Sequence, residues 1–275
     1  KMGGTMEYDF KYKVVVVTGA VGGIGRALSW RFAKAGARIV LVDLDQEQLS
    51  ALQNQVERSG VEVMSLVCDI VDPERCKQAM REVEENFGGV DVLINNAGIG
   101  HHSLFCNTDT DVIRRVMEVN FFGAVNCTKA ALDSLIQRKG MIITMSSVLG
   151  YSPMISLSGY AASKHALHGL FNSLRAELLN DGVHVMIACP GRTETDLRKH
   201  MLSGDGHIIE VERSEMLASP TDVANAIFHG AKKKKRLVIH SKVSKLTQFL
   251  YRYFPSYYEY KQLKPILKKL NKAIE

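Results

Sequence analysis

The sequence predicts an α/β protein with a Rossmann-like, doubly wound parallel sheet of about seven strands and a C-terminal helical extension. Short apolar runs alternate with helical patterns from residue 13 onward. The strand-like runs are continuously apolar, which is typical of strands that helices cover on both faces. Glycine-rich or polar segments follow several of these runs, at the sheet edge where such folds bind their ligands.

Each predicted strand is a short run of apolar, often β-branched residues. The predicted strands cover 14–17, 39–42, 61–67, 92–94, 141–145, 183–189 and 237–239. The segments between them have helical spacing, with glycine at several ends and proline at two starts. The predicted helices cover 24–35, 45–59, 73–87, two stretches within 111–138, 161–179 and 220–231. Right-handed crossovers between parallel strands then produce the doubly wound sheet.

The composition is that of an ordinary folded domain. Hydrophobic residues make up 46% of the 275 residues and charged residues 23%, which excludes a largely disordered chain. No apolar run is long enough to span a membrane, and no signal-peptide core follows the first residues. We therefore interpret residues 1–5 as a remnant of cloning, 6–240 as one domain, and 241–275 as a basic amphipathic extension.

The charge is divided unequally along the chain. Residues 232–275 contain 13 Lys and Arg against 2 acidic residues, whereas the preceding 231 residues contain 22 against 27. An acidic body therefore carries a basic tail. The five cysteines are odd in number and lack C-x-x-C spacing, so we expect free thiols in a reducing compartment and no metal site.

A glycine-rich turn, Thr18 to Gly25, follows the first strand. Glycines let a pyrophosphate approach the backbone, and the free amides and positive dipole end of the next helix attract it. Asp43 ends the second strand, where a carboxylate can accept both hydroxyls of an adenine ribose and repel a 2′-phosphate. Asp43 could equally cap the helix that follows.

Five motifs in order resemble those of the classical short-chain dehydrogenase/reductase family over about residues 12–240. They are T-G-x-x-x-G-x-G at 18–25, N-N-A-G at 95–98, Asn120 in the helical region after the fourth strand, Ser147 thirteen residues before the Y-x-x-x-K pair Tyr160 and Lys164, and P-G at 190–191. The resemblance implies hydride transfer between a nicotinamide dinucleotide and a secondary alcohol or ketone.

The resemblance also implies a role for each residue of this tetrad. Tyr160 is the expected general acid/base, and Ser147 holds the substrate oxygen. Lys164 holds the nicotinamide ribose, and Asn120 holds a water that leads from Lys164 to solvent. Tyr160 and Lys164 share one helix face, and a nearby ammonium with a cationic nicotinamide ring would favour the phenolate of a group whose ordinary pKa is about 10.

The cofactor contacts implied by the resemblance follow the strands. They fall on Gly19, Gly22, Gly23, Ile24, Gly25, Asp43, Leu44, Asp69, Ile70, Asn96, Ala97, Gly98, Tyr160, Lys164, Pro190, Gly191, Thr193 and Thr195. Relatives that prefer NADP carry Arg or Lys where this chain has Gly22 or Asp43–Leu44, so we expect NAD(H) over NADP(H). Asp69 could instead cap the helix that begins at Pro73.

The substrate side is less specific. The long segment 192–219 is the expected lid, with Gly204 and Gly206 as hinges. By position alone, we expect a substrate pocket lined by His101, His102, Tyr151 and Met154. An apolar alcohol or ketone is the expected substrate. The alternatives are a 3-oxoacyl thioester reductase and a dinucleotide-binding sensor or scaffold without catalysis.

The tail has helical spacing of apolar residues, broken at Pro255 and resuming in a second helix that Pro265 could open. The first stripe comprises Val243, Leu246, Phe249, Leu250 and Tyr253. It could dock on its own body or a second subunit, on an anionic membrane surface, or on an acidic partner. Nucleic acid is not expected, because no reader motif accompanies the charge. We expect a cytoplasmic homo-oligomer, dimeric or tetrameric, which the membrane alternative would place at a bilayer surface.

Overall fold

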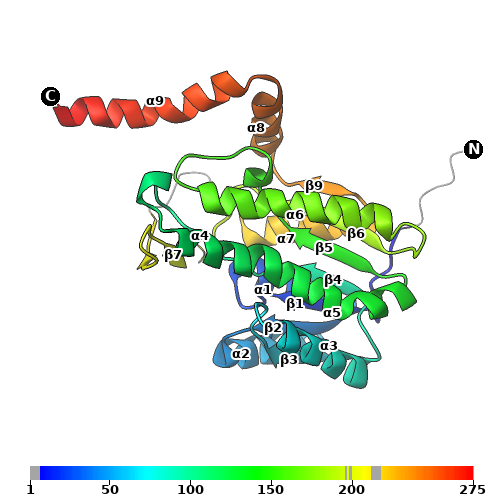
Figure 1. The fold of residues 1–275 in the computed structure, drawn as a ribbon. Coiled ribbons are helices and arrows are strands. Elements are labelled where there is room, and N and C mark those ends of the chain that lie inside the picture. Colours follow the sequence, from blue (N-terminus) through cyan, green and yellow to red (C-terminus); the bar gives the residue numbers. More distant parts are fainter. Residues whose placement is uncertain (1–6, 196, 198–199, 212–217, 275) are drawn as a thin grey trace, which may run out of the picture.

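A parallel sheet of seven strands forms the centre of this computed structural model, in the order β3-β2-β1-β4-β5-β6-β9 (Figure 1). The structure describes residues 7–195, 197, 200–211 and 218–274, with only the backbone described from 265 onward, so the predicted remnant 1–5 lies outside it. The strands are β1 (Val14–Thr18), β2 (Arg38–Asp43), β3 (Val63–Val67), β4 (Val92–Asn95), β5 (Met141–Met145), β6 (His184–Cys189) and β9 (Leu237–Ile239). The predicted doubly wound sheet is confirmed.

Helices cover both faces of the sheet. One layer is formed by α1 (Gly23–Ala33), α2 (Gln46–Glu57) and α7 (Pro220–Lys232), and the other by α3 (Pro73–Phe87), α5 (Gly123–Gln137) and α6 (Ser158–Glu177). Alternate side chains of β1 point to opposite layers: Val15 and Val17 join one core cluster, Val14 and Val16 the other. The central strands β1, β4 and β5 are mostly apolar because both of their faces are buried.

The helix caps decide between two interpretations of the acidic residues. Asp45 accepts a hydrogen bond from the amide of Gln48 and caps α2, while Asp72 caps α3. Asp43 and Asp69 are therefore not helix caps. Asp43 is the last residue of β2 and Asp69 follows the end of β3, so both lie at the edge of the sheet where ligands bind in doubly wound folds.

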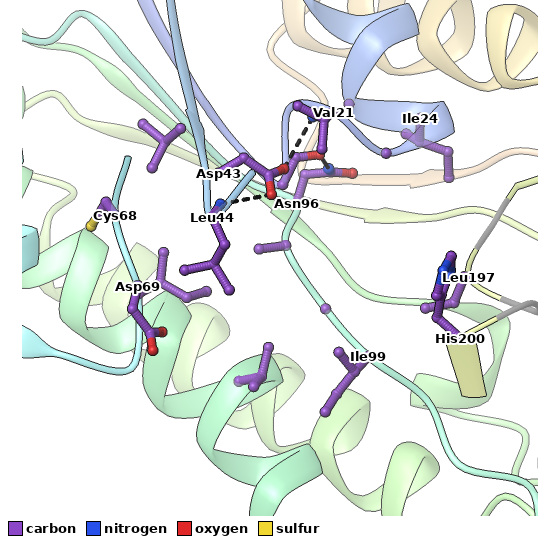
Figure 2. Close-up of a pocket in the computed structure, with 18 of the residues that line it drawn as sticks. Val21, Ile24, Asp43, Leu44, Cys68, Asp69, Asn96, Ile99, Leu197 and His200 are labelled. Carbon is purple, nitrogen blue, oxygen red and sulfur yellow. Dashed lines mark hydrogen bonds between the residues drawn. The ribbon is translucent and has the colours of Figure 1, made fainter. Parts of the chain in front are cut away.

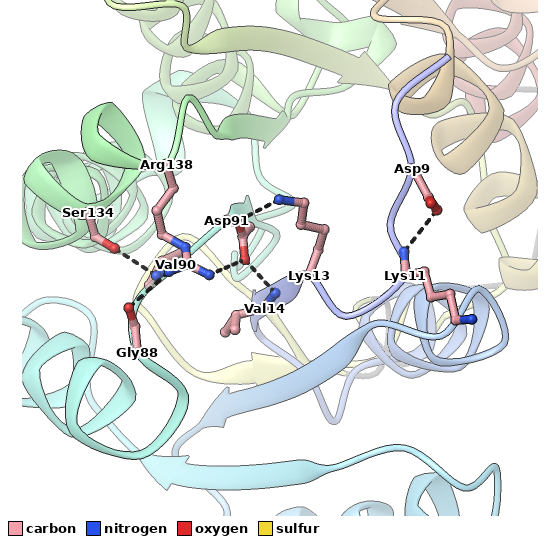
Figure 3. Close-up of polar contacts among 9 residues, drawn as sticks. All are labelled: Asp9, Lys11, Lys13, Val14, Gly88, Val90, Asp91, Ser134 and Arg138. Atoms are coloured by element: carbon pink, nitrogen blue, oxygen red, sulfur yellow. Dashed lines mark hydrogen bonds and ion pairs between the residues drawn. The ribbon is translucent and has the colours of Figure 1, made fainter. Parts of the chain in front are cut away.

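A buried carboxylate lies at the opposite edge of the sheet (Figure 3). Asp91 is 1% exposed and accepts from the Val14 amide at 2.9 Å, from Lys13 Nζ at 3.2 Å and from Arg138 Nη2 at 3.0 Å. Burial by itself would raise the pKa of Asp91, but these hydrogen bonds and the Arg138 charge lower it. The cluster fastens the start of β1 beside the start of β4.

The lid contains two short strands that the sequence did not predict, β7 (Met201–Leu202) and β8 (Ile208–Ile209). The amide of His102 donates to the Leu202 carbonyl, and the amide of Leu202 donates to the Gly100 carbonyl. The lid strand is therefore tied to the segment that follows β4. Such pairing joins residues far apart in sequence, which local periodicity does not reveal.

Two helices form the tail, α8 (Lys242–Tyr253) and α9 (Pro255–Ile274). The expected start of the second helix at Pro265 is wrong, because α9 begins ten residues earlier and runs through that proline. Pro255 fits the first helical turn, where its missing amide hydrogen has no partner to lose. In Figure 1, α9 extends away from the sheet. Of the helices in the described ranges, none is long and apolar enough to cross a bilayer.

Candidate active site

A groove of 810 Å³ opens beyond the carboxyl ends of β1, β2, β3 and β4 (Figure 2). It lies where the strand order reverses direction, between β1 and β4. The predicted cofactor residues that line it are Gly19, Gly22, Gly23, Ile24, Gly25, Asp43, Leu44, Asp69, Ile70, Asn96, Ala97, Gly98 and Thr195. One continuous surface thus gathers residues from four separate loops and the lid.

The glycine turn is tight enough to require its glycines. Gly19 has φ +63°, and a Cβ there would lie 2.7 Å from the Ala97 Cα. A Cβ at Gly25 would collide with the Gly19 carbonyl. The N-cap of α1 is Gly22, which has no side chain to bond the first amides of the helix. Those amides and the positive dipole end of α1 suit a pyrophosphate, so the residues present fit a dinucleotide.

Asp43 is held in place by two backbone amides. Its Oδ2 accepts from Val21 N at 3.1 Å and its Oδ1 from Leu44 N at 2.8 Å (Figure 2). The carboxylate therefore faces the groove in a set orientation. The nearby cation Arg26 donates to the Val21 carbonyl and to Gln48 Oε1 at 2.9 Å. Arg26 is not among the lining residues, whereas Asp43 is, so this side of the groove presents the carboxylate and not Arg26 to a ligand.

The structure brings Tyr160, Lys164 and Ser147 together. Tyr160 and Lys164 lie in the first two turns of α6, and Ser147 follows β5. Lys164 is 4% exposed, and its Nζ donates to the Met145 carbonyl at 2.9 Å and lies 5.5 Å from the centre of the Tyr160 ring. The predicted helix start at residue 161 lies three residues late, so Tyr160 belongs to the first turn.

The protein alone does not favour the phenolate of Tyr160. Burial raises the pKa of Tyr160 to about 12, against a smaller lowering by the hydrogen bond with Ser147. Burial also lowers the pKa of Lys164 to about 8, partly opposed by Cys189. The expectation that the Lys164 ammonium and a cationic nicotinamide ring together favour the phenolate remains a prediction, because the pKa of Tyr160 in the protein alone is set mainly by burial.

Asn120 lies in a π-helical turn, η2 (Glu118–Phe122), between α4 (Thr110–Met117) and α5. Its amide is 1% exposed. Oδ1 accepts from Ile99 N at 2.8 Å, and Nδ2 donates to the Ile99 carbonyl at 2.9 Å and to Ser163 Oγ at 3.0 Å. The side chain thus joins α6 to the segment after β4. Its predicted water-holding role remains a prediction.

A second cavity, of 340 Å³, adjoins the groove and is the candidate substrate pocket. Ile24, Thr195 and Leu197 line both spaces, so the two are continuous. Its lining otherwise includes Gly100, His102, Ser146, Ser147, Val148, Leu149, Met154, Leu157, Tyr160, Pro190, Gly191, Arg192, Thr193, Met201 and Val211. Tyr160 and Ser147 thus supply hydroxyls to a mainly apolar cavity.

Two of the four residues expected in the substrate pocket do not line it. His102 and Met154 do, whereas His101 is fully buried and the Tyr151 ring packs edge-on against His168. The alternation of side chains along an extended segment explains why only one of two neighbouring histidines faces the cavity.

Several groove residues were not predicted from the sequence. Val21, Gln48, Val71, Arg115, Glu118, Val119, Leu197 and His200 also line the dinucleotide groove. Of these, Val21 belongs to the glycine motif at 18–25, so the motif itself could have predicted that this residue lines the groove. Val71 lies in the loop after β3, and the others come from helices and the lid, whose approach to the groove only the folded chain shows.

No group of three or more His, Cys, Asp or Glu side chains in the described ranges could hold a metal ion. All five cysteines are free; four are buried and Cys106 is exposed. The Sγ atoms of Cys76 and Cys127 lie 3.7 Å apart. Burial and thiol contacts raise the pKa of Cys76 to about 12, its hydrogen bond with Cys127 being the largest cause. These thiols are packing groups.

The glycine cradle, Asp43 and the adjacent Tyr–Lys–Ser cluster define the class of protein. Residues 13–205 match the family described as short chain dehydrogenase. The chain belongs to the short-chain dehydrogenase family. This short-chain dehydrogenase is 39% identical over 235 residues to dehydrogenase/reductase SDR family member 7B of Bos taurus, covering 82% of the chain and 72% of that relative.

Other relatives of this short-chain dehydrogenase differ in name and bound cofactor. It is 35% identical over 240 residues to an 11-beta-hydroxysteroid dehydrogenase of Pinus massoniana, and the match covers 84% of this chain and 67% of that relative. A short chain dehydrogenase/reductase from Burkholderia phymatum in complex with NAD superposes with a TM-score of 0.80 at 25% identity. The match covers 89% of this chain and 94% of that structure. An alcohol dehydrogenase from Thermococcus sibiricus, complexed with 5-hydroxy-NADP, superposes with a TM-score of 0.73 at 27% identity, covering 82% and 94%.

Proposed function

We propose that this short-chain dehydrogenase transfers a hydride between NAD(H) and an apolar secondary alcohol or ketone. One observation carries the proposal: Tyr160 and Ser147 line an apolar cavity that is continuous with the dinucleotide groove. A substrate oxygen between these two hydroxyls would lie at the junction of the two spaces. The family membership supports the reaction class, and the cavity supports the character of the substrate.

The bound dinucleotide supplies or accepts the hydride. The chain itself handles the proton. Ser147 donates a hydrogen bond to the substrate oxygen, and the Tyr160 hydroxyl moves a proton to that oxygen in reduction or from it in oxidation. A pKa of about 12 keeps Tyr160 protonated, as reduction requires. Oxidation needs the base form, which the Lys164 ammonium together with an oxidised cofactor ring would stabilise.

The character of the cavity supports an apolar substrate. Leu149, Met154, Leu157, Met201 and Val211 contribute to its wall. A hydrocarbon skeleton is favoured there because it leaves few polar groups unpaired. The relative from Pinus massoniana bears the name of a steroid dehydrogenase, which agrees with this substrate class.

The preference for NAD(H) is supported by Asp43. Its carboxylate faces the groove while two amides hold it, and Arg26 is engaged with Val21 and Gln48. A 2′-phosphate placed beside this carboxylate would meet a like charge. The ratio of kcat/KM with NAD(H) to that with NADP(H) measures the preference, and equal values would contradict it.

The reaction is tested with purified protein, a panel of steroid and other secondary alcohols and ketones, and the absorbance of the reduced nicotinamide. Tyr160→Phe should lower kcat about 100- to 10,000-fold. The control Tyr12→Phe alters an exposed tyrosine outside both spaces and should leave kcat unchanged. Dinucleotide binding without turnover of any substrate would favour a sensor or scaffold, and selective turnover of 3-oxoacyl thioesters would favour that alternative.

Assembly and location complete the proposal. Members of this family often form oligomers, so we expect a homodimer or homotetramer, which light scattering of the full chain measures. The free cysteines agree with a reducing, cytoplasmic environment. Cell fractionation tests that location.

A further inference from the structure

The apolar stripe of α8 faces away from the body of the protein. Ser244 is the buried residue of this helix, 4% exposed, and its Oγ lies where a side chain on Gly191 would have to go. The helix thus packs through a small polar residue. Its apolar residues on the other side remain open: Val243 is 66% exposed, Leu246 57%, Phe249 51% and Tyr253 59%. Docking on the chain's own body therefore does not explain the stripe.

Helix α9 extends the same apolar surface. The rings of Tyr251 and Tyr258 meet at 5.4 Å and join the two helices on the body side. On the outer side, the Phe249 ring lies 4.9 Å from that of Tyr253 and 6.2 Å from that of Phe254. We call the exposed apolar surface the tail face; it comprises Val243, Leu246, Phe249, Tyr253, Phe254, Tyr257, Tyr260 and Leu263.

Positive charges are interspersed with the tail face. The exposed cations within 242–264 are Lys242, Lys245, Arg252, Lys261 and Lys264, against the single acid Glu259. Arg252 and Lys261 lie over the rings of Tyr253 and Tyr257, at 5.7 and 5.5 Å. In the described part of the chain, no carboxylate forms an ion pair with any of these five cations. Their charge is available to a negatively charged partner.

We infer that the tail face binds the surface of an anionic lipid bilayer. Exposed aromatic rings and aliphatic side chains enter the boundary between headgroups and acyl chains, while lysines extend to the phosphates. A second copy of the chain is a poorer partner, because the centres of protein interfaces are depleted in lysine. A purely acidic partner would leave the eight apolar side chains unexplained.

The tail face is coupled to the candidate substrate pocket. The side chain of Gln262 in α9 forms two hydrogen bonds with one loop. Its Nε2 donates to the Pro153 carbonyl at 3.0 Å, and its Oε1 accepts from Ile155 N at 3.1 Å. The Tyr258 hydroxyl donates to the Ser152 carbonyl at 3.4 Å. Met154 and Leu157 of the same loop line the cavity. Binding through the tail face therefore brings this cavity wall close to the lipid, which dissolves apolar alcohols and ketones.

The inference goes beyond the proposed reaction and does not depend on it. It is tested by co-sedimentation of the full chain with vesicles of phosphatidylcholine alone or of phosphatidylcholine with phosphatidylserine. We expect binding to the anionic vesicles that weakens with added salt. Lys242→Gln with Lys245→Gln should lower partitioning about 25-fold, since each surface cation contributes about fivefold. Leu246→Ser with Phe249→Ser should lower it about tenfold or more.

Matched controls use the same substitutions elsewhere. Lys233→Gln with Lys235→Gln removes two charges from the segment before β9, at the far end of that strand, and Leu179→Ser removes an exposed leucine after α6. Both should pellet like the wild type, and all variants should keep its melting temperature. Absence of wild-type binding to anionic vesicles, or equal losses in the controls, would overturn the inference. A third outcome would also overturn it: the wild type does not bind vesicles, and the tail-face variants dissociate an oligomer. That outcome would assign the tail face to contact with a second copy of the chain.

Discussion

The Nε2 atom of His101 accepts a 2.8 Å hydrogen bond from the backbone amide of Gly159, the residue before Tyr160. An acceptor nitrogen carries no proton, so Nδ1 carries it and donates to Ser103 Oγ at 3.2 Å. His101 also bridges to Leu202 of the lid strand. The buried imidazole therefore joins the segment after β4 to the start of the helix that bears Tyr160, while the backbone of His101 pairs with the lid.

His101→Phe should lower both stability and kcat. It leaves the Gly159 amide without a partner in a buried site, which costs about 1–3 kcal/mol. The start of α6 loses an anchor, so Tyr160 is held less well and kcat falls more than KM rises. Denaturant unfolding and steady-state kinetics measure the two effects. His165→Gln on the exposed side of the same helix is the control, and an unchanged kcat in His101→Phe would refute the anchoring role.

The same bond predicts a pH effect. Burial and the neighbouring His102 lower the pKa of His101. A lowered histidine pKa in the folded state means that this contribution to stability is complete above the unfolded value of about 6.5 and is lost as the pH falls through the folded value. The wild type should therefore lose activity on the acid side, because a protonated ring cannot accept from Gly159. His101→Phe should show a flatter acid limb.

His168 offers a second, independent pH test of stability. Burial lowers its pKa to about 4, with smaller contributions from His165 and Arg175. In the unfolded chain His168 takes up a proton near pH 6.5, whereas in the folded chain it stays neutral until about pH 4. The free energy of unfolding therefore falls between these two pH values, by up to about 3 kcal/mol. His168→Phe removes the titrating group. Melting temperatures between pH 7 and about pH 4 should then fall less steeply than in the wild type.

Asp43→Ser should change the cofactor preference. Removing the carboxylate removes the repulsion of a 2′-phosphate and the acceptor for the ribose hydroxyls. We expect kcat/KM with NAD(H) to fall about tenfold or more, as the loss of charged hydrogen bonds implies, and that with NADP(H) to rise. Asp45→Ser is the control, since its carboxylate caps α2 and is absent from the groove lining. A parallel change with both cofactors would contradict the role given to Asp43.

Asp91→Ala should destabilise the protein by about 3 kcal/mol, because Val14 N, Lys13 and Arg138 lose a shared buried partner. Because the pKa of Asp91 is lowered in the folded state, its carboxylate stabilises the fold fully at pH values above the unfolded pKa of about 3.9. This stabilisation is lost as the pH falls through the pKa of the folded state. Denaturant unfolding at pH 7 gives the difference. Asp9→Ala removes an exposed acid from the same edge (Figure 3) and should change stability by less than about 0.5 kcal/mol.

Element order and the main functional loops could be predicted because their information is local. Continuous apolar runs predict buried parallel strands, and the Tyr160–Lys164 spacing predicts one helix face wherever the helix lies. The predictions were wrong or incomplete at the ends of helices and in the pairing of short strands. The helix that bears Tyr160 starts before residue 161, and the short strands β7 and β8 pair with each other while Leu202 of β7 bonds to Gly100 and His102.

By itself, the sequence determined the doubly wound sheet, the glycine cradle with Asp43, and the order of the catalytic motifs, since periodicity and spacing are properties of the chain. Only the tertiary structure decided that His101 is buried against Gly159 while His102 faces the cavity. It also decided that α8 packs through Ser244 and exposes Leu246 and Phe249. An amphipathic pattern defines two faces of a helix, but which face meets the body depends on the shape of the surface it reaches, here the glycine at position 191.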